Sequence, residues 1–352
     1  MGISVTGAIS GGNPRNLEAI RYRDGVYHIE PWSEDGDANY KFHLLVEIRN
    51  GGARPVDVPL EIEWADIRYA SLRDQMYASS GDGWRLLVGA IDGSAVRARV
   101  RAAPGSTLVS LHPAYRDADH QRLLQRSVAA GAVHSVEGKS AAGADIDMLR
   151  FGDAARSQPI VLVSSRVHPY ETAASFCVEG IIDTLTGPRG REILERFQVA
   201  VIPMANPDGV EGGLCKRVGP GGPNPEKGLG SGDPTASALQ NAVDRLRPAS
   251  LLELHGWMNR PADGLSVYDR ALAGRFVEEF ARVDLQKGPR RDWREGDHTS
   301  GPDDPTDVRQ YARRAHASRV LVLSFGWIDR DVNTMKNLGG ASLFALTSAL
   351  AG

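Results

Sequence analysis

The 352-residue sequence has few of the features that mark membrane-spanning, disulfide-bonded or nucleic-acid-binding proteins. No apolar run approaches the roughly 18 residues that a transmembrane helix needs, and the first residues lack the basic region and apolar core of a signal peptide. The two cysteines, Cys177 and Cys215, form no CxxC pair and suit a reducing compartment. A net charge of −3, with both signs along the chain, gives no reason to expect a nucleic-acid or membrane partner. We therefore expect a cytoplasmic protein.

The first 112 residues have the pattern of an all-β domain. Apolar residues occupy every second position from 42 to 48, from 60 to 64 and from 96 to 100, and turn sequences such as Asn50-Gly51-Gly52 separate these runs. Period-two runs between turns are typical of half-buried antiparallel strands. We predict a sandwich-like N-terminal domain over residues 1–112.

From residue 113 onward, strand and helix patterns alternate. One helix is predicted over 117–130, and a second follows residue 171, where apolar residues recur at helical spacing. Strand patterns lie at 145–151, 159–163, 199–202, 251–254 and 318–323. Alternating strands and helices form a mainly parallel sheet with helices on both faces. We therefore predict an α/β domain with a mixed, mainly parallel sheet over residues 113–352.

Two histidines and a glutamate follow the predicted strands. His168 and Glu171 come after the strand at 159–163, three residues apart, and His255 ends the strand at 251–254. The carboxyl ends of strands in an open α/β sheet are where ligands bind, and zinc accepts imidazole nitrogen and carboxylate oxygen. Three protein ligands with one open position describe a catalytic zinc site. Glu253, on the same face of its strand as His255, could orient that histidine.

The alternative is that each histidine is an ordinary hydrogen-bonded residue of the core or surface, because an HxxE match alone is weak evidence for a metal site. A further motif favours the metal site. Asn206-Pro207-Asp208-Gly209-Val210 follows the strand at 199–202 and has strong turn chemistry. The order of strand, His-Pro-x-Glu, helix, strand, Asn-Pro-Asp-Gly and a later strand ending in Leu-His-Gly resembles the zinc metallocarboxypeptidases, or funnelins. Their cytosolic carboxypeptidase subgroup is the most similar.

The resemblance covers about residues 113–352 and implies Zn²⁺ held by His168, Glu171 and His255. It also implies an arginine that stabilises the oxyanion, and an Asn-Arg pair that grips the substrate's terminal carboxylate. Arg217 matches the first of these in the Gly/Pro-rich segment 211–235. Asn224 matches the asparagine, but Pro225 stands where the second arginine is expected, which puts selectivity for a free α-carboxylate in question.

The last predicted strand departs from the family pattern. A glutamate near its end serves the family as general base, and the most natural phasing puts Ser324 at that position; a second phasing puts Val322 there. Neither side chain can replace a carboxylate in acid–base work at neutral pH. Three explanations stay open. The serine is an inactivating change, peptidase activity has been lost, or the base comes from elsewhere, with Glu295, His298, Asp329 and Asp331 as candidates.

These features lead to one main hypothesis and two alternatives. The main hypothesis is a zinc-dependent hydrolase that cleaves an amide bond at or near a peptide C-terminus. The first alternative is a zinc amidase or deacylase that acts on a small molecule, because the Asn-Arg pair is incomplete. The second is an inactive pseudoenzyme that binds peptides, because Ser324 replaces the expected glutamate. The expected partner is accordingly a peptide or a small amide substrate.

Overall fold

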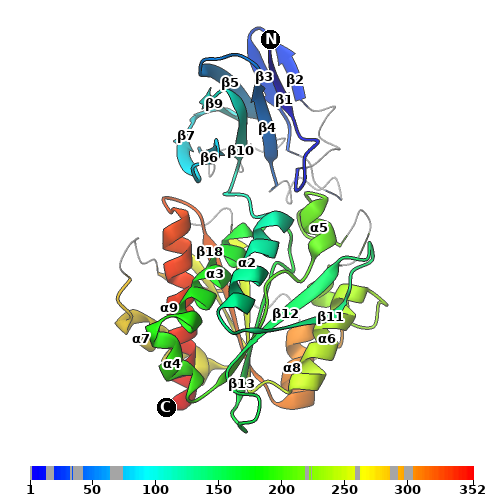
Figure 1. Ribbon diagram of the computed structural model, residues 1–352, viewed down its shortest axis with the longest axis vertical. Coiled ribbons are helices and arrows are strands. Elements are labelled where there is room, and N and C mark those ends of the chain that lie inside the picture. The colour runs from blue at the N-terminus through cyan, green and yellow to red at the C-terminus, as the bar shows by residue number, and fades with distance from the viewer. Residues whose placement is uncertain are drawn as a thin grey trace.

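The computed structural model describes residues 2–12, 20–31, 34, 43–63, 74–218, 222, 224–257, 262–285, 292–296 and 304–352. A smaller body of strands at the N-terminus sits above a larger body in which helices surround a sheet (Figure 1). The chain passes between them after β10 (Gly105–Ser110) and before α2 (Asp117–Ala129). The predicted domain boundary after residue 112 lies in this connection, and it stays a proposal. Within the described residues, no helix has the length and apolar content needed to cross a bilayer.

The N-terminal body contains two five-stranded sheets with the orders β1-β4-β10-β6-β7 and β2-β3-β5-β9-β8. Side chains from both sheets share one apolar cluster, which includes Ile48 of one sheet and Leu60 and Val96 of the other. The predicted all-β region is therefore confirmed, although the expected strand positions Phe42 and Trp64 lie outside the described residues. Its other strands are β1 (Ile3–Thr6), β2 (Ile20–Arg23), β3 (Val26–Ile29), β4 (Leu45–Asn50), β5 (Val56–Glu63), β6 (Gln75–Ser79), β7 (Arg85–Val88), β8 (Ala90–Asp92) and β9 (Ala95–Ala102).

The larger body is built on an eight-stranded sheet with the order β11-β12-β14-β13-β15-β18-β16-β17. The central strands β14, β13, β15 and β18 run parallel to one another, whereas β11, β12 and β16 join antiparallel. The predicted mixed, mainly parallel sheet is confirmed. Its strands are β11 (Val133–Lys139), β12 (Asp145–Phe151), β13 (Ile160–Ser165), β14 (Gln198–Ile202), β15 (Ser250–Trp257), β16 (Asp263–Val267), β17 (Trp293–Gly296) and β18 (Arg319–Gly326).

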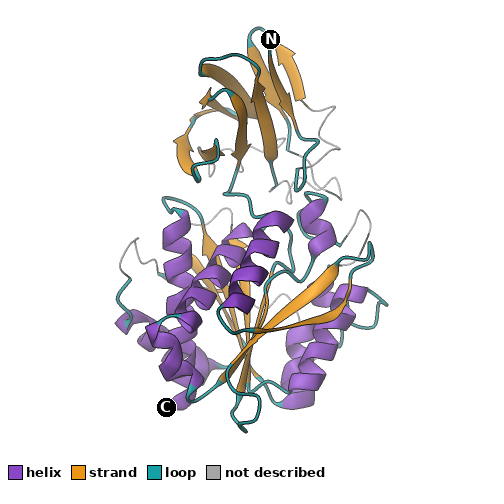
Figure 2. Ribbon diagram, in the orientation of Figure 1, coloured by secondary structure: helices purple, strands orange, loops and turns teal. Residues whose placement is uncertain are grey.

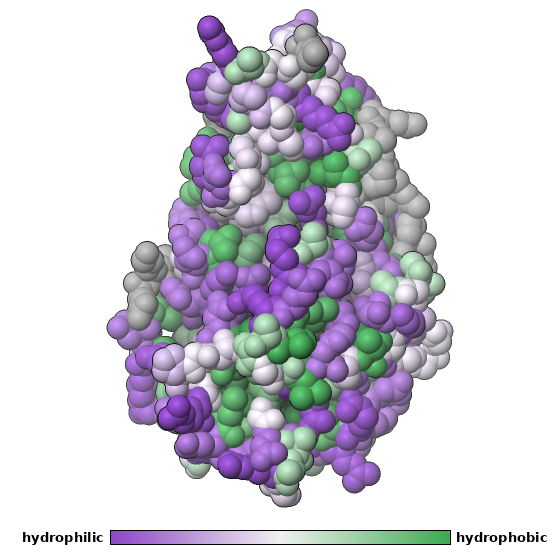
Figure 3. Space-filling view, viewed as in Figure 1, coloured by the Kyte–Doolittle hydropathy of each residue, from purple (hydrophilic) through white to green (hydrophobic). Residues whose placement is uncertain are grey.

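Helices cover both faces of this sheet (Figure 2). One apolar cluster joins the sheet to α2, α3 (Thr172–Thr186), α7 (Arg270–Arg282) and α9 (Val332–Ala351), with α4 (Pro188–Leu194) against α3. A second cluster joins the other face to α6 (Pro234–Leu246) and α8 (Val308–His316). On the molecular face in Figure 3, apolar side chains are interspersed among hydrophilic ones.

The order of the strands creates a place for a site. From β13 the chain passes to β14 on one side of it and then to β15 on the other. A reversal of this kind opens a crevice outside the carboxyl ends of the strands, where ligands bind in open α/β sheets.

Candidate metal centre

The structure brings His168, Glu171 and His255 together beyond the carboxyl ends of β13 and β15. Nδ1 of His168 lies 2.9 Å from Oε1 of Glu171, and Nδ1 of His255 lies 2.7 Å from Oε2 of the same carboxylate. Glu171 sits directly before α3, so the start of that helix fixes its position. The three side chains are at most 6% exposed. One buried carboxylate therefore faces the Nδ1 atoms of both histidines.

The charges of these groups support one another despite their burial. Burial alone would raise the pKa of Glu171, but His255 and His168 outweigh it and hold that pKa below its usual range. Burial alone would lower the pKa of His255, but Glu171 and Glu253 raise it well above its ordinary value. The site thus stabilises an ionised carboxylate beside the two imidazoles, and a bound cation would have to replace the imidazole proton.

A second carboxylate, which the sequence did not single out, faces the opposite edge of the imidazoles. Glu226 lies in η3 (Pro225–Lys227), and its Oε2 is 3.5 Å from Nε2 of His168 and 3.9 Å from Nε2 of His255. One ligand atom from each of these three residues lies within 4.8 Å of the others. Burial would raise the pKa of Glu226, but His168, Arg309 and His255 lower it to about 2.

A buried arginine joins the carboxylates around the histidines. Arg309 of α8 is 5% exposed, and its guanidinium lies 3.4 Å from Glu226 and 3.6 Å from Glu253 while it pairs with Asp307 at 2.7 Å. Glu253 in turn lies 3.2 Å from Nε2 of His255, near enough to pair with the ring by charge, but among the described residues this nitrogen has no partner with hydrogen-bond geometry. No sequence pattern singles out Arg309, because it belongs to a helix rich in charged residues.

Ser324 lies beside the candidate metal centre. It is buried on β18 and is the register partner of His255 on β15, so both side chains point to the same face of the sheet. Three of the other proposed bases have contacts elsewhere: Asp331 caps α9, Asp329 accepts a hydrogen bond from Gln75, and Glu295 is exposed and lies near Arg270. The fourth, His298, lies outside the described residues.

The two residues expected to bind substrate have local contacts here. The Asn224 side chain accepts a hydrogen bond from the Glu226 N–H at 3.2 Å and lies 3.3 Å from Nε2 of His168, so it helps to seat η3. Nη1 of Arg217 donates to the Gly222 carbonyl at 2.7 Å. The structure therefore places Asn224 against His168, while the Arg217 guanidinium makes a contact within its own loop.

The Asn-Pro-Asp-Gly motif ties the loops of the site together. Asn206 precedes α5 (Pro207–Glu211), and its carbonyl oxygen Oδ1 accepts the Gly209 N–H at 3.0 Å. Its amide nitrogen donates to the carbonyls of Val167, at 3.2 Å, and Arg217, at 3.0 Å. The motif therefore begins a short helix, with Asn206 as its cap, where its composition predicts only a tight turn, and it also fastens the His168 loop to the Arg217 loop.

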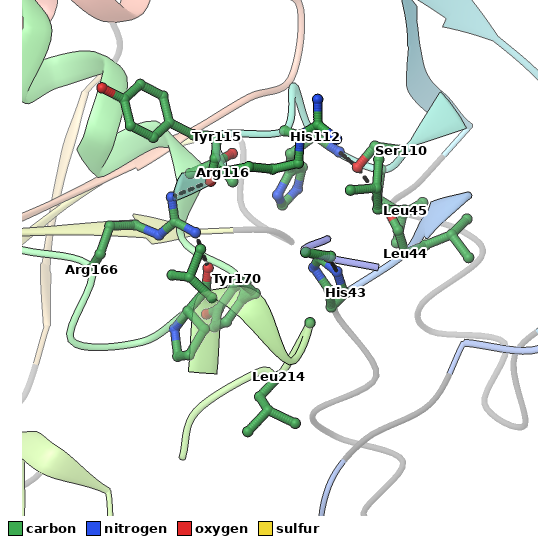
Figure 4. A pocket seen from close by; sticks show the side chains of 17 residues that line it. His43, Leu44, Leu45, Ser110, His112, Tyr115, Arg116, Arg166, Tyr170 and Leu214 are labelled. Atoms are coloured by element: carbon green, nitrogen blue, oxygen red, sulfur yellow. Dashed lines mark hydrogen bonds between the residues drawn. The ribbon is translucent and has the colours of Figure 1, made fainter. Parts of the chain in front are cut away.

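A small cavity beside the His168 loop is lined by residues of both bodies of the protein (Figure 4). Arg166 lines it, is 2% exposed and has a left-handed backbone with φ of 56°. Its guanidinium donates to the carbonyls of Tyr115, at 3.1 Å, and Pro169, at 2.6 Å. Arg166 thus links the segment that follows the N-terminal body to the loop that carries His168.

Comparison with known proteins finds zinc carboxypeptidases. The family model described as zinc carboxypeptidase matches residues 124–217. The chain is 40% identical to human cytosolic carboxypeptidase 1 over 60 residues, and 43% identical to mouse cytosolic carboxypeptidase 6 over 53 residues. These stretches are 16% and 14% of this chain, and they span only 5% and 10% of the relatives' own lengths.

Two solved structures share the fold over nearly the whole chain. The metallo-carboxypeptidase from Burkholderia cenocepacia superposes with a TM-score of 0.81 at 18% identity, with 99% of each chain covered. The metallo-carboxypeptidase from Pseudomonas aeruginosa, solved in complex with (2-guanidinoethylmercapto)succinic acid, gives 0.79 at 18% identity and the same coverage. At this identity the likeness establishes the fold.

Proposed function

The chain resembles the zinc carboxypeptidases in its motifs, its sequence and its fold, and from this premise we propose that it is a zinc-dependent hydrolase. The proposed reaction is cleavage of an amide bond at or near a peptide C-terminus. The observation that carries the proposal is the buried contact of Glu171 with Nδ1 of both His168 and His255. The location that we propose is the cytoplasm, which is consistent with two buried cysteines that form no disulfide and with relatives named as cytosolic.

The residues fit zinc, which accepts two imidazole nitrogens and a carboxylate. We propose His168, Glu171 and His255 as its ligands. Glu171 is favoured over Glu226 as the carboxylate because it lies closer to both rings, and because Glu226 is also engaged by Arg309. When bound, zinc would polarise the substrate carbonyl and lower the pKa of a bound water.

The remaining residues would orient this centre. With Nδ1 of each histidine given to the metal, Nε2 is left for a carboxylate, and partners of that kind fix the tautomer and orientation of the ring. Glu226 faces Nε2 of both histidines, and Glu253 faces that of His255. Arg309 would hold the two glutamates in place. Arg217 would stabilise the oxyanion, as the family resemblance implies.

Two observations favour other functions for the same site. Ser324 cannot act as the general base, so a protein that binds peptides without cleaving them is the first alternative. Pro225 interrupts the expected Asn-Arg pair, and Asn224 seats η3, so an amidase or deacylase acting on a small molecule is the second. Equal turnover of free and C-terminally amidated peptides would favour the amidase.

The decisive test is metal content measured together with hydrolysis. Protein purified without chelators should contain about one equivalent of zinc by plasma mass spectrometry and should regain it after stripping and reconstitution. A mixed peptide library with free C-termini then reports activity. Less than about a tenth of an equivalent of zinc, with none regained, would refute the proposal. Full zinc occupancy with peptide binding but no cleavage would support the binding protein instead.

A further inference from the structure

Glu34 of the N-terminal region binds the backbone of the loop that carries Arg217. The backbone N–H of Cys215 donates to Oε2 of Glu34 at 2.9 Å, while those of Lys216 and Arg217 donate to Oε1 at 2.5 and 3.0 Å. Successive backbone N–H groups that converge on one anion form a nest, a common anion-binding arrangement of the protein backbone. Here the chain's own glutamate fills it.

We infer that Glu34 is a positioning residue for the proposed active site: by filling this nest, it fixes the loop that carries Arg217. The N-terminal body would then help to hold a loop of the active site in position. The inference rests on the proposed function for the catalytic role of Arg217, but the effect of Glu34 on the loop stands apart from that function.

Side chains of the same loop also pack into the N-terminal body. Cys215 is fully buried and belongs to the apolar cluster of the sandwich, together with Tyr170 of the His-Pro-x-Glu loop. Leu214 and His43 both line the cavity between the two bodies (Figure 4). The loop is therefore anchored to the N-terminal body by apolar burial on one side of the backbone and by Glu34 at its N–H groups.

The other edge of the loop is held by the motifs of the site. The carbonyl of Arg217 accepts a hydrogen bond from the Asn206 amide at 3.0 Å, and the carbonyl of Cys215 accepts the Tyr170 N–H at 3.5 Å. The loop thus uses its carbonyls toward the metal-site loops and its N–H groups toward Glu34. Loss of Glu34 would leave three donors without this acceptor while the opposite contacts remain.

A carboxylate is suited to this task. Hydrogen bonds from N–H groups to a carboxylate are roughly twice as strong as those to a neutral acceptor. Two carboxylate oxygens serve three donors here, whereas glutamine would offer one oxygen and an amide group that can only donate. Glu34→Gln should therefore weaken the loop less than Glu34→Ala, which empties the nest.

Limited trypsin digestion tests the inference without relying on activity, because Lys216 and Arg217 are themselves trypsin sites. We expect trypsin to cut Glu34→Ala after these residues about 10-fold faster than the unaltered chain. The cutting rate of Glu34→Gln should lie between those two rates. Sodium formate, a free carboxylate that fits the emptied nest, should slow the cutting of Glu34→Ala, and sodium chloride at equal ionic strength should not. Glu63→Ala changes an exposed glutamate of the same sandwich and should leave the rate unaltered.

The outcomes separate this inference from the proposed function. Unaltered cutting in Glu34→Ala, or faster cutting that formate does not reverse, would overturn it, and Glu34→Gln decides the question if Glu34→Ala fails to fold. Where the chain hydrolyses peptides, Glu34→Ala should lower kcat with zinc content unaltered, and formate should restore it. A chain without zinc or hydrolysis would refute the proposed function, while the digestion result would still decide the role of Glu34.

Discussion

Ser324 and His255 are direct partners across the parallel strands β18 and β15, and both side chains are buried on the same face of the sheet. The position where the family resemblance calls for a general base is thus next to a proposed metal ligand, but it carries a hydroxyl. The backbone there is continuous with its neighbours, since the register runs unbroken from Ser250–Arg319 to Trp257–Gly326. On the proposed function, the strand that would carry the general base is in place, and the base itself is missing.

Restoring that carboxylate should produce or increase hydrolysis. We predict that Ser324→Glu raises the rate of peptide cleavage by about 10²–10⁴-fold, the usual contribution of a positioned base, while zinc content stays the same. Ser324→Gln introduces a side chain of nearly the same size as glutamate that cannot act as a base. It should therefore give no gain in the rate of hydrolysis. Equal rates in both variants, measured on the same peptide library, would mean that the base lies elsewhere or that the cleft only binds.

The two glutamates at the histidines should contribute unequally to zinc binding. Glu171→Gln removes a proposed ligand, whereas Glu226→Gln removes a partner of the rings, for which a loss of about 10–100-fold in affinity is typical. We therefore expect the larger loss in Glu171→Gln. Competition of the metal-free variants with a chromophoric zinc chelator measures both affinities. The reverse order would identify Glu226 as the ligand, through the Nε2 atoms that it faces.

Local patterns in the sequence were enough to predict the class of fold and the centre of the site. The buried parallel strands appear as apolar runs, and His168 and His255 follow two of them. A helix was predicted over 117–130, and α2 spans Asp117–Ala129. Because neighbouring parallel strands end at the same edge of the sheet, residues that follow such runs meet even when they are far apart in the chain.

The residues that surround the centre could not be predicted this way. Glu226 lies in a Gly/Pro-rich segment without periodicity, and its approach to the histidines depends on how that segment folds back. Arg309 resembles a surface residue, since burial of an arginine is rare unless carboxylates meet it, and its partners come from separate elements. Glu34 and Arg217 are 183 residues apart. Such contacts follow from tertiary packing, which no local pattern encodes.

The close approach of α3 and α9 offers a test of the packing that supports the site. A Cβ at Gly339 of α9 would lie 1.9 Å from the carbonyl oxygen of Cys177 in α3. Gly339→Ala should therefore lower the free energy of unfolding by about 1–3 kcal/mol, as overpacking does. Gly274→Ala in α7, where a Cβ meets nothing within 4 Å, should instead raise it by about 0.5–1 kcal/mol. Urea unfolding measures both variants. Destabilisation of equal size in Gly339→Ala and Gly274→Ala would contradict the close approach of α3 and α9.

A buried carboxylate away from the metal centre should make stability depend on pH. Asp147 of β12 lies 2.9 Å from Nε2 of His120 and 2.7 Å from Nε2 of His134. Burial would raise the pKa of Asp147, but the hydrogen bonds and charge of the two histidines lower it below its ordinary value of 3.8. A carboxyl whose pKa is lower in the folded state stabilises that state above the unfolded pKa, and this stabilisation is lost as the pH falls through the folded pKa.

We therefore predict that Asp147→Asn lowers the free energy of unfolding by about 1–3 kcal/mol at neutral pH. The difference from the unaltered chain should shrink once the pH falls below 3.8, as the native carboxyl becomes protonated. Asp145→Asn, on the same strand but 44% exposed, should have little effect at either pH. Urea unfolding at neutral and acidic pH provides the four comparisons. A difference for Asp147→Asn that stays constant with pH would show that the loss comes from packing and neutral hydrogen bonds, with no contribution from the charge of the carboxylate.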